Sequence, residues 1–385
     1  MQNAIVLLIV VVAVAAFLLL AAGVDQGRLG DLPPEGGWDQ IIDSSFEPVA
    51  CPIADRSLDD THYTGPLIDT HIHIAAIPDD LSAPDLGHDG RPVMGVNIRM
   101  TDYVCMMDTE QTSKVFAFFP VWEPIVPELL EVVNRTMAAY PDRFVPFLMP
   151  PENDNSPGGY PTVNAETLQT MLNAYPGLFK GYGEIGLYAR TGGAAALPPD
   201  AERLLEIYPV VRERGLLVYV HLGEGQKESF ERALEDNQDI SFIWHGDQLI
   251  PYVNGEQDLS NVEDILSNHP NAYYGVDELY GDVWLLRPEV SKEEFLAHFA
   301  DPEPLLEKDL ATWKGFIERH PDQVLWGTDR GWSAPWSVDP DVALTLNTYS
   351  RAFIGRLDPA VQEKFAYQNA ENLISTLSGT SILGN

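Results

Sequence analysis

Basic residues are scarce in this sequence. Its 385 residues include 23 lysines and arginines, seven of them lysine, against 58 aspartates and glutamates, which gives a formal net charge of −35 at pH 7. Such a surface repels the phosphate backbone of nucleic acids, so the charge argues against nucleic acid as a partner. The chain is long for an average domain, but its length is within the range of one α/β barrel.

Cysteine is equally scarce. The only two cysteines, Cys51 and Cys105, belong to no CxxC motif and to no cluster with histidine, which excludes a zinc finger. They are able to form one disulfide bond if this part of the chain lies outside the cytoplasm. The sequence favours two free, buried thiols, and the disulfide is the alternative.

One long apolar run opens the chain. Ala4–Val24 contains no charged residue, and its 21 residues would rise about 31 Å as a helix, roughly one membrane core. No lysine or arginine precedes the run, whereas a cleavable signal peptide usually begins with basic residues. We predict an uncleaved transmembrane signal-anchor over residues 1–25, with the following domain outside the cytoplasm. Cleavage near Ala21–Gly23, which would give a secreted protein, is the alternative.

The rest of the chain divides into a linker and a large domain. Residues 26–65 are rich in glycine, proline and acidic residues and show no periodicity, which predicts a linker. From residue 66 to about residue 380, short apolar runs alternate with amphipathic stretches. The eight predicted strands are Leu67–Ile74, Val115–Pro120, Phe144–Pro150, Gly181–Tyr188, Leu216–Glu224, Ile240–Asp247, Asn271–Glu278 and Val324–Trp332.

These runs predict the fold class. Strands that are apolar on both faces suit a parallel sheet covered by helices. Eight βα units within residues 66–380 favour a (β/α)8 TIM barrel. A doubly wound open sheet is the second choice. It would more often carry a glycine-rich phosphate turn after its first strand, and this sequence has none.

Metal-binding side chains recur at the ends of the predicted strands. His71 and His73 are two residues apart, so both point from the first strand into the barrel mouth. His221, His245 and Asp329 end the fifth, sixth and eighth strands. Burial of paired imidazoles is costly unless a partner satisfies them, and a divalent metal ion does so. We predict a metal centre with Zn²⁺ as first choice and Mn²⁺ or Fe²⁺ as alternatives.

Other residues of these runs receive weaker assignments. Glu184 ends the fourth strand and is a candidate ligand, or a carboxylate that bonds a neighbouring histidine. The residues Ile68, Ile72 and Ile74 are expected on the opposite face of the first strand, against the helices. The remaining histidines lie in predicted loops or helices and are expected to be structural or superficial: His62, His88, His269, His298 and His320.

The strand-end motifs together resemble the amidohydrolase superfamily, specifically its amidohydrolase-related (amidohydrolase 2) branch. The motifs are DTHIHI, GEIGL, VHLGE, FIWHG and GTD, and the likeness extends over residues 66–377. The resemblance implies a metal held by His71, His73, His221 and Asp329. It implies that His245 is an acid/base beside the metal, or a ligand of a second ion. Some members have a glutamate at the fourth strand that bridges two ions.

The metal determines the predicted chemistry. A bound Zn²⁺ lowers the pKa of its water ligand and polarises a carbonyl group. Asp329 would take a proton from that water, and His245 would stabilise the oxyanion or protonate the leaving group. We predict a hydrolase of a small-molecule amide, lactone or ester. By resemblance, a decarboxylase of an unsaturated or aromatic acid is the alternative. A tethered binding module without catalysis is the third possibility.

The substrate is less well indicated. Arg330, directly after Asp329, is the predicted partner of a substrate carboxylate, and Trp332 is a predicted aromatic wall of the pocket. Long segments after the first and seventh strands, Ala75–Asp102 and Asp282–Pro304, are expected to shape the pocket, so no relative's substrate is transferred. Dimers are common in the resembled branch, and a homodimer is expected on that basis alone.

Overall fold

The computed structural model describes most of the predicted barrel domain and part of the segment that precedes it. The described residues are 37–52, 58–76, 98–121, 125–150, 157–277, 279, 289–331 and 334–378. The predicted N-terminal span lies outside these ranges. Within them, no helix combines the length and apolar character that crossing a membrane requires.

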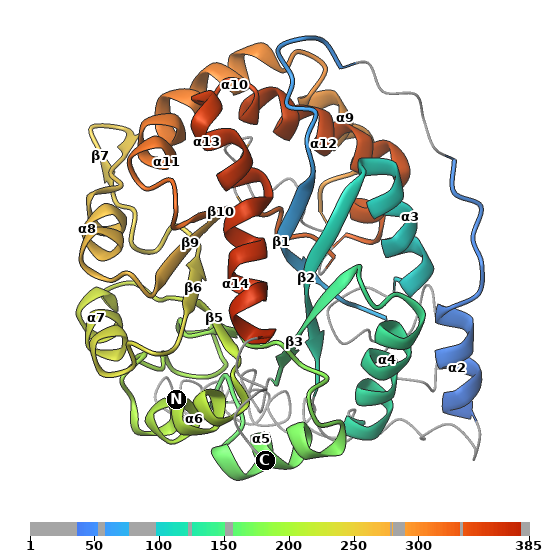
Figure 1. Ribbon diagram of the computed structural model, residues 1–385, viewed down its shortest axis with the longest axis vertical. Helices are drawn as coiled ribbons and strands as arrows, with labels where there is room; N and C mark the ends of the chain where they lie inside the picture. The colour runs from blue at the N-terminus through green and yellow to red at the C-terminus, as the bar shows by residue number, and fades with distance from the viewer. Residues whose placement is uncertain are drawn as a thin grey trace, which may run out of the picture.

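Eight parallel strands form one sheet in their order along the chain (Figure 1). An isolated parallel bridge between Ile72 and Arg330 connects the first strand to the segment after the last, so the sheet is barrel-like. A doubly wound sheet would reverse its strand order, and this sheet does not. Each strand overlaps a predicted one: β1 (Leu67–His73), β2 (Thr112–Pro120), β3 (Phe144–Met149), β4 (Gly181–Gly186), β5 (Leu217–His221), β6 (Phe242–His245), β9 (Ala272–Val276) and β10 (Val324–Trp326).

Helices alternate with the strands and surround the sheet (Figure 1). Those between β1 and β9 are α3 (Met100–Glu110), α4 (Val126–Ala139), α5 (Ala165–Ala174), α6 (Glu202–Arg214), α7 (Lys227–Asp236) and α8 (Ser260–Asn268). Those that follow β9 are α9 (Lys292–His298), α10 (Glu303–Asp309), α11 (Gly315–Arg319), α12 (Pro340–Ile354), α13 (Pro359–Glu363) and α14 (Asn369–Ser378). A small hairpin, β7 (Tyr252–Val253) with β8 (Glu256–Gln257), follows β6.

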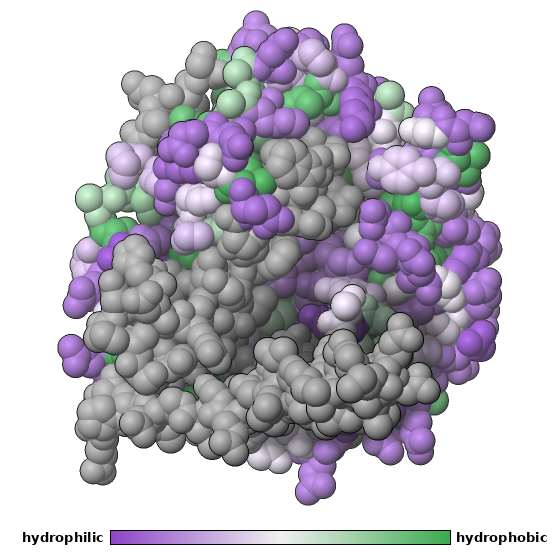
Figure 2. Space-filling model, turned by 180° about the vertical axis from the view of Figure 1, so that it is seen from behind, coloured by the Kyte–Doolittle hydropathy of each residue, from purple (hydrophilic) through white to green (hydrophobic). Residues whose placement is uncertain are grey.

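The core has two layers, an outer one between the sheet and the helices and an inner one inside the barrel. The inner layer is covered by α14 at one end of the barrel. Large side chains such as Phe116, Phe147 and Tyr219 fill the barrel interior, together with Ala370 and Leu373 of α14. In Figure 1, α14 crosses the near end of the barrel. The strands end on the opposite face, where the surface is hollowed near its centre and the described residues are largely hydrophilic (Figure 2). This end is where barrel enzymes place their chemistry.

Strand β1 departs from simple alternation. Its pairing with β2 is irregular between Asp69 and Ile72. Ile72 and Ile74 pack in the outer layer, as predicted, whereas Ile68 packs in the barrel interior. The prediction that Ile68 faces the helices is therefore wrong. The irregular register changes the face between Ile68 and Ile72.

Part of the predicted linker packs on the barrel. A helix, α2 (Gly37–Ser45), buries Ile42 in the outer layer, and Asp43 pairs with Arg135 of α4 at 2.7 Å. Tyr63, just before β1, is also buried. The glycine- and proline-rich composition of residues 26–65 concealed these few apolar anchors.

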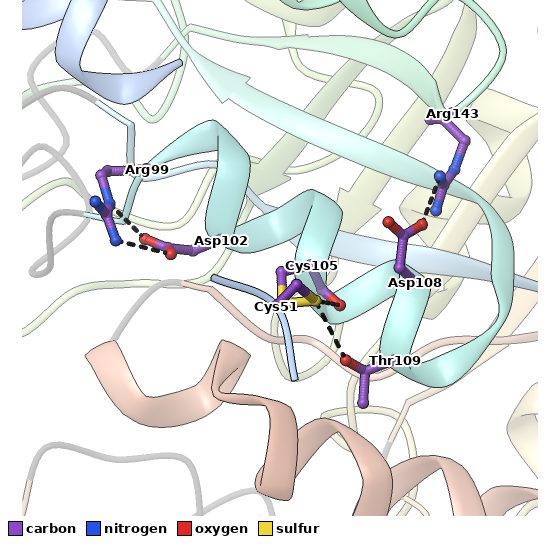
Figure 3. Close-up of a disulfide and its surroundings, with 7 residues drawn as sticks. All are labelled: Cys51, Arg99, Asp102, Cys105, Asp108, Thr109 and Arg143. Carbon is purple, nitrogen blue, oxygen red and sulfur yellow. Dashed lines mark hydrogen bonds and ion pairs between the residues drawn. A yellow bond between two sulfur atoms is a disulfide. The ribbon is translucent and has the colours of Figure 1, made fainter. Parts of the chain in front are cut away.

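The two cysteines form a disulfide bond, so the prediction of two free thiols is wrong (Figure 3). Cys51 belongs to the segment before the barrel and Cys105 to α3. Packing of that segment against α3 brings the two thiols together. The bond covalently attaches the segment to the barrel domain.

Loss of this bond is expected to destabilise the barrel domain. A Cys51→Ser/Cys105→Ser variant should lose about 2–4 kcal/mol of unfolding free energy, because the bond closes a long loop and restricts the unfolded chain. Urea unfolding with and without a phosphine reductant measures the loss. The reductant should destabilise the natural protein and leave the double variant unchanged. Equal stability of the two proteins would contradict the expectation.

Candidate metal centre

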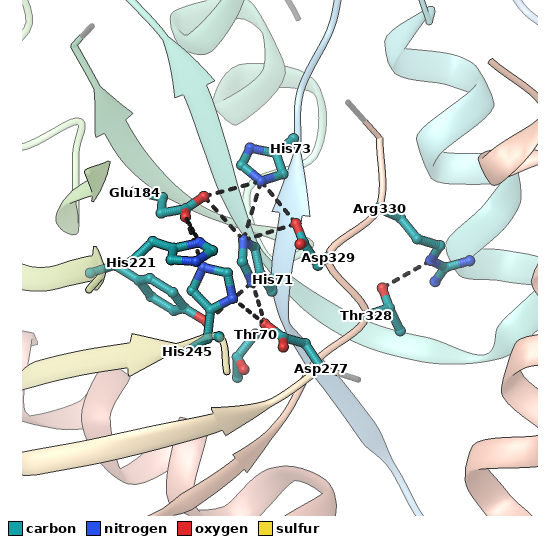
Figure 4. Close-up of polar contacts among 12 residues, drawn as sticks. Thr70, His71, His73, Glu184, His221, His245, Asp277, Thr328, Asp329 and Arg330 are labelled. Atoms are coloured by element: carbon teal, nitrogen blue, oxygen red, sulfur yellow. Dashed lines mark hydrogen bonds and ion pairs between the residues drawn. The ribbon is translucent and has the colours of Figure 1, made fainter. Parts of the chain in front are cut away.

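Four side chains converge where the strands end: His71 and His73 of β1, Glu184 of β4, and Asp329 after β10 (Figure 4). Nε2 of His71 lies 3.2 Å from Nε2 of His73, 3.4 Å from Oε2 of Glu184 and 3.3 Å from Oδ1 of Asp329. Nε2 of His73 lies 3.2 Å from the same Glu184 oxygen and 3.1 Å from the same Asp329 oxygen. Two nitrogens and two oxygens thus surround one small volume.

The close spacing and chemical type of these atoms suit a divalent metal ion. Ligand atoms about 2.0–2.1 Å from a tetrahedral Zn²⁺ are about 3.3–3.4 Å from one another. The five separations given above run from 3.1 to 3.4 Å. Imidazole nitrogens and carboxylate oxygens are also the ligand types that divalent metal ions of this class prefer. These residues therefore suit a divalent metal ion: the donor atoms of His71, His73 and Glu184 lie within 4.8 Å of one another, and so do those of His71, His245 and Asp329. The predicted ligand set stays a prediction.

Local backbone requirements explain two glycines beside this centre. Gly183 has a φ of +126°, and a Cβ there would come within 2.1 Å of the Tyr219 carbonyl oxygen. Only glycine allows β4 to carry Glu184 this close to β5. A Cβ on Gly327 would lie 3.1 Å from Cβ of His71, so glycine at this position admits the histidine.

Asp277, at the end of β9, is the site residue that the motif analysis missed. Its Oδ2 accepts hydrogen bonds from Nδ1 of His71 at 2.7 Å and from Nδ1 of His245 at 2.9 Å. A carboxylate in this position fixes the tautomer of each ring and turns Nε2 toward the centre. Its place at the end of the predicted strand Asn271–Glu278 was the available signal.

His245 lies between two carboxylates. Its Nδ1 faces Asp277, and its Nε2 lies 2.7 Å from Oε1 of Glu184. Burial disfavours the charged ring, but the charges of Asp277 and Glu184 outweigh burial and raise the pKa of His245 well above its usual value. The geometry thus favours a protonated His245 ring beside the centre, and its predicted acid/base role stays a prediction.

His221 lies beside the four-atom cluster, and its predicted role as a ligand stays a prediction. Its Nδ1 is 3.2 Å from Oε1 of Glu184, and its Nε2 is 2.8 Å from Oε1 of Gln248. It thus faces the Glu184 oxygen that His245 also contacts. Glu184, His221 and His245 offer donor atoms within 4.8 Å of one another, enough to hold a second ion with Glu184 as the shared ligand.

A cavity adjoins His221. It has a volume of about 570 Å³ and is lined by the loops after β5 and β6, including Glu224, Asp247, Gln248 and Tyr252. Gln248 both lines this cavity and contacts His221. Its volume is sufficient for a small-molecule substrate or its leaving group.

Arg330 does not face the mouth, so its predicted role in substrate binding is wrong. Its side chain is fully buried and pairs with Glu110 at 2.6 Å and with Asp69 at 3.5 Å. Figure 4 shows it directed away from the histidines. The backbone of Asp329 is left-handed, with a φ of +48°, so the chain turns here, and Asp329 faces the histidines while Arg330 points away. The other predicted substrate contact, Trp332, lies outside the described residues.

The remaining histidines occupy loops or helix ends, as predicted. His62 lies in the loop before β1 and pairs with Asp59 at 2.8 Å. His269 and His320 follow α8 and α11, and His298 ends α9. His88 lies outside the described residues.

The sequence matches no family model and no curated protein. Solved structures with a similar chain path include a Burkholderia multivorans amidohydrolase with bound Zn, with 12% identity and a TM-score of 0.49 over 81% of this chain and 99% of that chain. A probable 2-pyrone-4,6-dicarboxylic acid hydrolase from Acinetobacter baumannii with citric acid bound has 12% identity and a TM-score of 0.46, over 80% and 99%. A dihydroxybenzoic acid decarboxylase from Polaromonas sp. JS666 with bound manganese has 14% identity and a TM-score of 0.38, over 81% and 97%. These neighbours are amidohydrolase-type proteins, the type that the strand-end motifs resemble.

Metal uptake should depend on pH. Burial opposes protonation of His71. The negative charge of Asp329 and the hydrogen bonds that His71 makes with Asp277 and Glu184 outweigh burial and raise the pKa of His71 to about 9 in the metal-free protein. A proton therefore competes with the metal below that pH, so Zn²⁺ affinity should rise between pH 6.5 and 9 with release of protons. Calorimetric titration in buffers of different ionisation enthalpy measures both quantities.

The matched variant is Asp277→Asn. It should bind Zn²⁺ about 10–100-fold more weakly, because two rings lose the carboxylate that orients them. Its affinity should also level off at a lower pH, since His71 loses a charged partner. A pH-independent affinity in the natural protein, or an unchanged affinity in the variant, would contradict the assigned role of Asp277.

Arg330→Met tests the structural role of Arg330. The variant leaves Glu110 and Asp69 buried without their cation, and should lose about 3–5 kcal/mol of unfolding free energy. Arg99→Met is the control, because it breaks an exposed pair with Asp102 and should cost less than about 1 kcal/mol. Urea unfolding of both variants gives the comparison. A stable Arg330→Met protein with weakened substrate binding would restore the original prediction.

Proposed function

We propose that the protein is a metal-dependent hydrolase of a small-molecule amide, lactone or ester. The observation that carries the proposal is that an oxygen of Glu184 and an oxygen of Asp329 each lie 3.1–3.4 Å from the Nε2 atoms of His71 and His73, beside a histidine placed to donate a proton. A divalent metal ion bound there would lower the pKa of a water ligand and polarise a substrate carbonyl group. We favour Zn²⁺, because imidazole nitrogens together with carboxylate oxygens suit it.

The proposed roles follow from the contacts. His71, His73, Glu184 and Asp329 would hold the ion, and Asp329 would accept a proton from the attacking water. Its side chain is 17% exposed, against none for His71, so it lies on the open side of the cluster. His245 donates the proton at its Nε2 to the leaving group, and Asp277 stabilises the ring in its charged form.

A second candidate reaction has support from the same histidine. In a decarboxylation, the bond between the carboxyl carbon and its neighbour breaks, and the electron pair left on that neighbour takes up a proton. His245 is positioned between two carboxylates and holds such a proton. A small carboxylic acid whose electron pair can be delocalised is therefore the alternative substrate.

We also propose that the barrel lies outside the cytoplasm. The disulfide between Cys51 and Cys105 supports this location, because such bonds persist in oxidising compartments. The apolar run over residues 4–24 would then act as the membrane anchor, or as a signal that is removed.

The test compares metal-stripped protein with protein reloaded with Zn²⁺ or Mn²⁺. Each form is assayed against a panel of aryl esters, lactones and amides, and for CO₂ release from aromatic acids. We expect hydrolysis only in the metal-loaded forms. His71→Ala should lose both metal and activity. His245→Asn should keep the metal and lose about 10²–10⁴-fold in kcat.

His320→Asn is the control variant, since His320 follows α11 at the outside of the barrel. It should keep full metal content and activity. Release of CO₂ without hydrolysis of any panel member would select the decarboxylase. Stoichiometric metal with neither activity would contradict both reactions.

A further inference from the structure

A buried tyrosine connects two segments of the chain that leave the metal centre. Tyr103 belongs to α3, and its side chain is fully buried. Its hydroxyl group accepts a hydrogen bond from the N–H of Ala75 at 2.9 Å and donates one to the carbonyl of Gly331 at 3.3 Å. Ala75 follows His73 by two residues, and Gly331 follows Asp329 by two residues. One phenol group therefore holds together the segments that follow two candidate ligands.

Asp329 needs such support because of its backbone conformation. Its φ of +48° lies in the left-handed region, which is less favourable for aspartate than for glycine. A conformation of this kind persists only where the surrounding structure holds it. Gly331 has a φ of +95°, and a Cβ there would lie 2.2 Å from the carbonyl oxygen of His73. The chain therefore makes a tight turn directly against β1, and this turn places Asp329 beside the histidines.

Helix α3 holds this turn at two points. Tyr103 and Glu110 are seven residues apart, which is about two helical turns, so both point to the same side of α3. Glu110 pairs with Arg330 at 2.6 Å, and Tyr103 contacts the next residue, Gly331. Between them, Cys105 carries the disulfide bond that attaches α3 to the segment before the barrel (Figure 3). The helix is therefore a fixed support for the turn after β10.

We propose that Tyr103 is a positioning residue of the metal centre, and that it acts by holding Asp329 in its left-handed conformation beside the ion. Both hydrogen bonds of its hydroxyl group go to backbone atoms, so Tyr103 acts through the chain and not as a ligand. Without the hydroxyl group, the turn after Asp329 would move relative to the segment after His73. The Asp329 carboxylate would then lose its fixed position. This inference rests on the proposed metal-dependent function and adds the residue that orients one proposed ligand.

The first test measures Co²⁺ binding to the full-length, metal-stripped protein by absorption and calorimetry. Co²⁺ is the probe because its visible absorption depends on the geometry of its ligands. Tyr103→Phe removes the hydroxyl group and keeps the ring. We expect this variant to bind Co²⁺ about tenfold more weakly and with an altered visible spectrum, because residues that support metal ligands typically affect metal affinity by about 10–100-fold.

Tyr208→Phe is the matched control. Tyr208 of α6 is also buried, and its hydroxyl group donates to the carbonyl of Pro199 at 2.6 Å, in the loop before α6, so this bond supports no candidate ligand. Both variants lose a buried hydrogen bond and should show similar losses of stability in urea unfolding. Tyr208→Phe should keep the Co²⁺ affinity and spectrum of the natural protein. An unchanged affinity and spectrum in Tyr103→Phe, or equal changes in both variants, would overturn the proposal.

The second test separates this inference from the proposed function. With saturating Zn²⁺, Tyr103→Phe should lower kcat about tenfold with little change in KM, because Asp329 is the proposed proton acceptor and not a substrate contact. A Co²⁺ spectrum altered in Tyr103→Phe, in a protein that hydrolyses no ester, lactone or amide, would contradict the hydrolase proposal alone. Hydrolysis with unchanged kcat and Co²⁺ affinity in Tyr103→Phe would contradict the inference alone. Absence of Co²⁺ binding by the natural protein would contradict both.

Discussion

The junction between the first and last strands is the constraint on which the rest of the structure depends. The backbone N–H of His73 donates to the carbonyl of Arg330 at 2.7 Å, and this contact closes the sheet. The same junction places Asp329 beside the two histidines of β1, while Arg330 enters the layer between β1 and α3. Its ion pairs with Glu110 and Asp69 neutralise two buried carboxylates there. Closure of the barrel and assembly of the metal centre are therefore one structural event.

Charge balance governs the centre itself. Three carboxylates and four imidazoles gather in a volume from which water is largely excluded, and each carboxylate contacts at least two rings. Burial opposes ionisation of Glu184. The charge of His245, with hydrogen bonds from the surrounding histidines, outweighs burial and holds the pKa of Glu184 well below its usual range. Anionic carboxylates and rings oriented by Asp277 give a set of donors in place before any ion binds. Such preorganisation reduces the cost of binding an ion.

Most of the fold and part of the centre could be predicted from the sequence, because both depend on local alternation. Two-residue periodicity places His71 and His73 on one face, and strand ends gather at one end of a barrel. The same periodicity does not extend to Asp329, because β10 ends at Trp326 and the backbone of Asp329 is left-handed. Asp277 was visible at the end of its predicted strand. The disulfide and the contact between His221 and Gln248 could not be predicted, since both depend on how loops pack in three dimensions.

Glu184 links the two halves of the centre. Its Oε2 belongs to the cluster with His71 and His73, whereas its Oε1 faces His221 and His245. A single ion held by Oε2 would leave the proton on Nε2 of His245. A second ion held by Oε1 and His245 would displace that proton. Acid catalysis by His245 and binding of a second ion are therefore mutually exclusive. The proposed hydrolase would need a proton for its leaving group, and for this reason we propose that it would use a single ion.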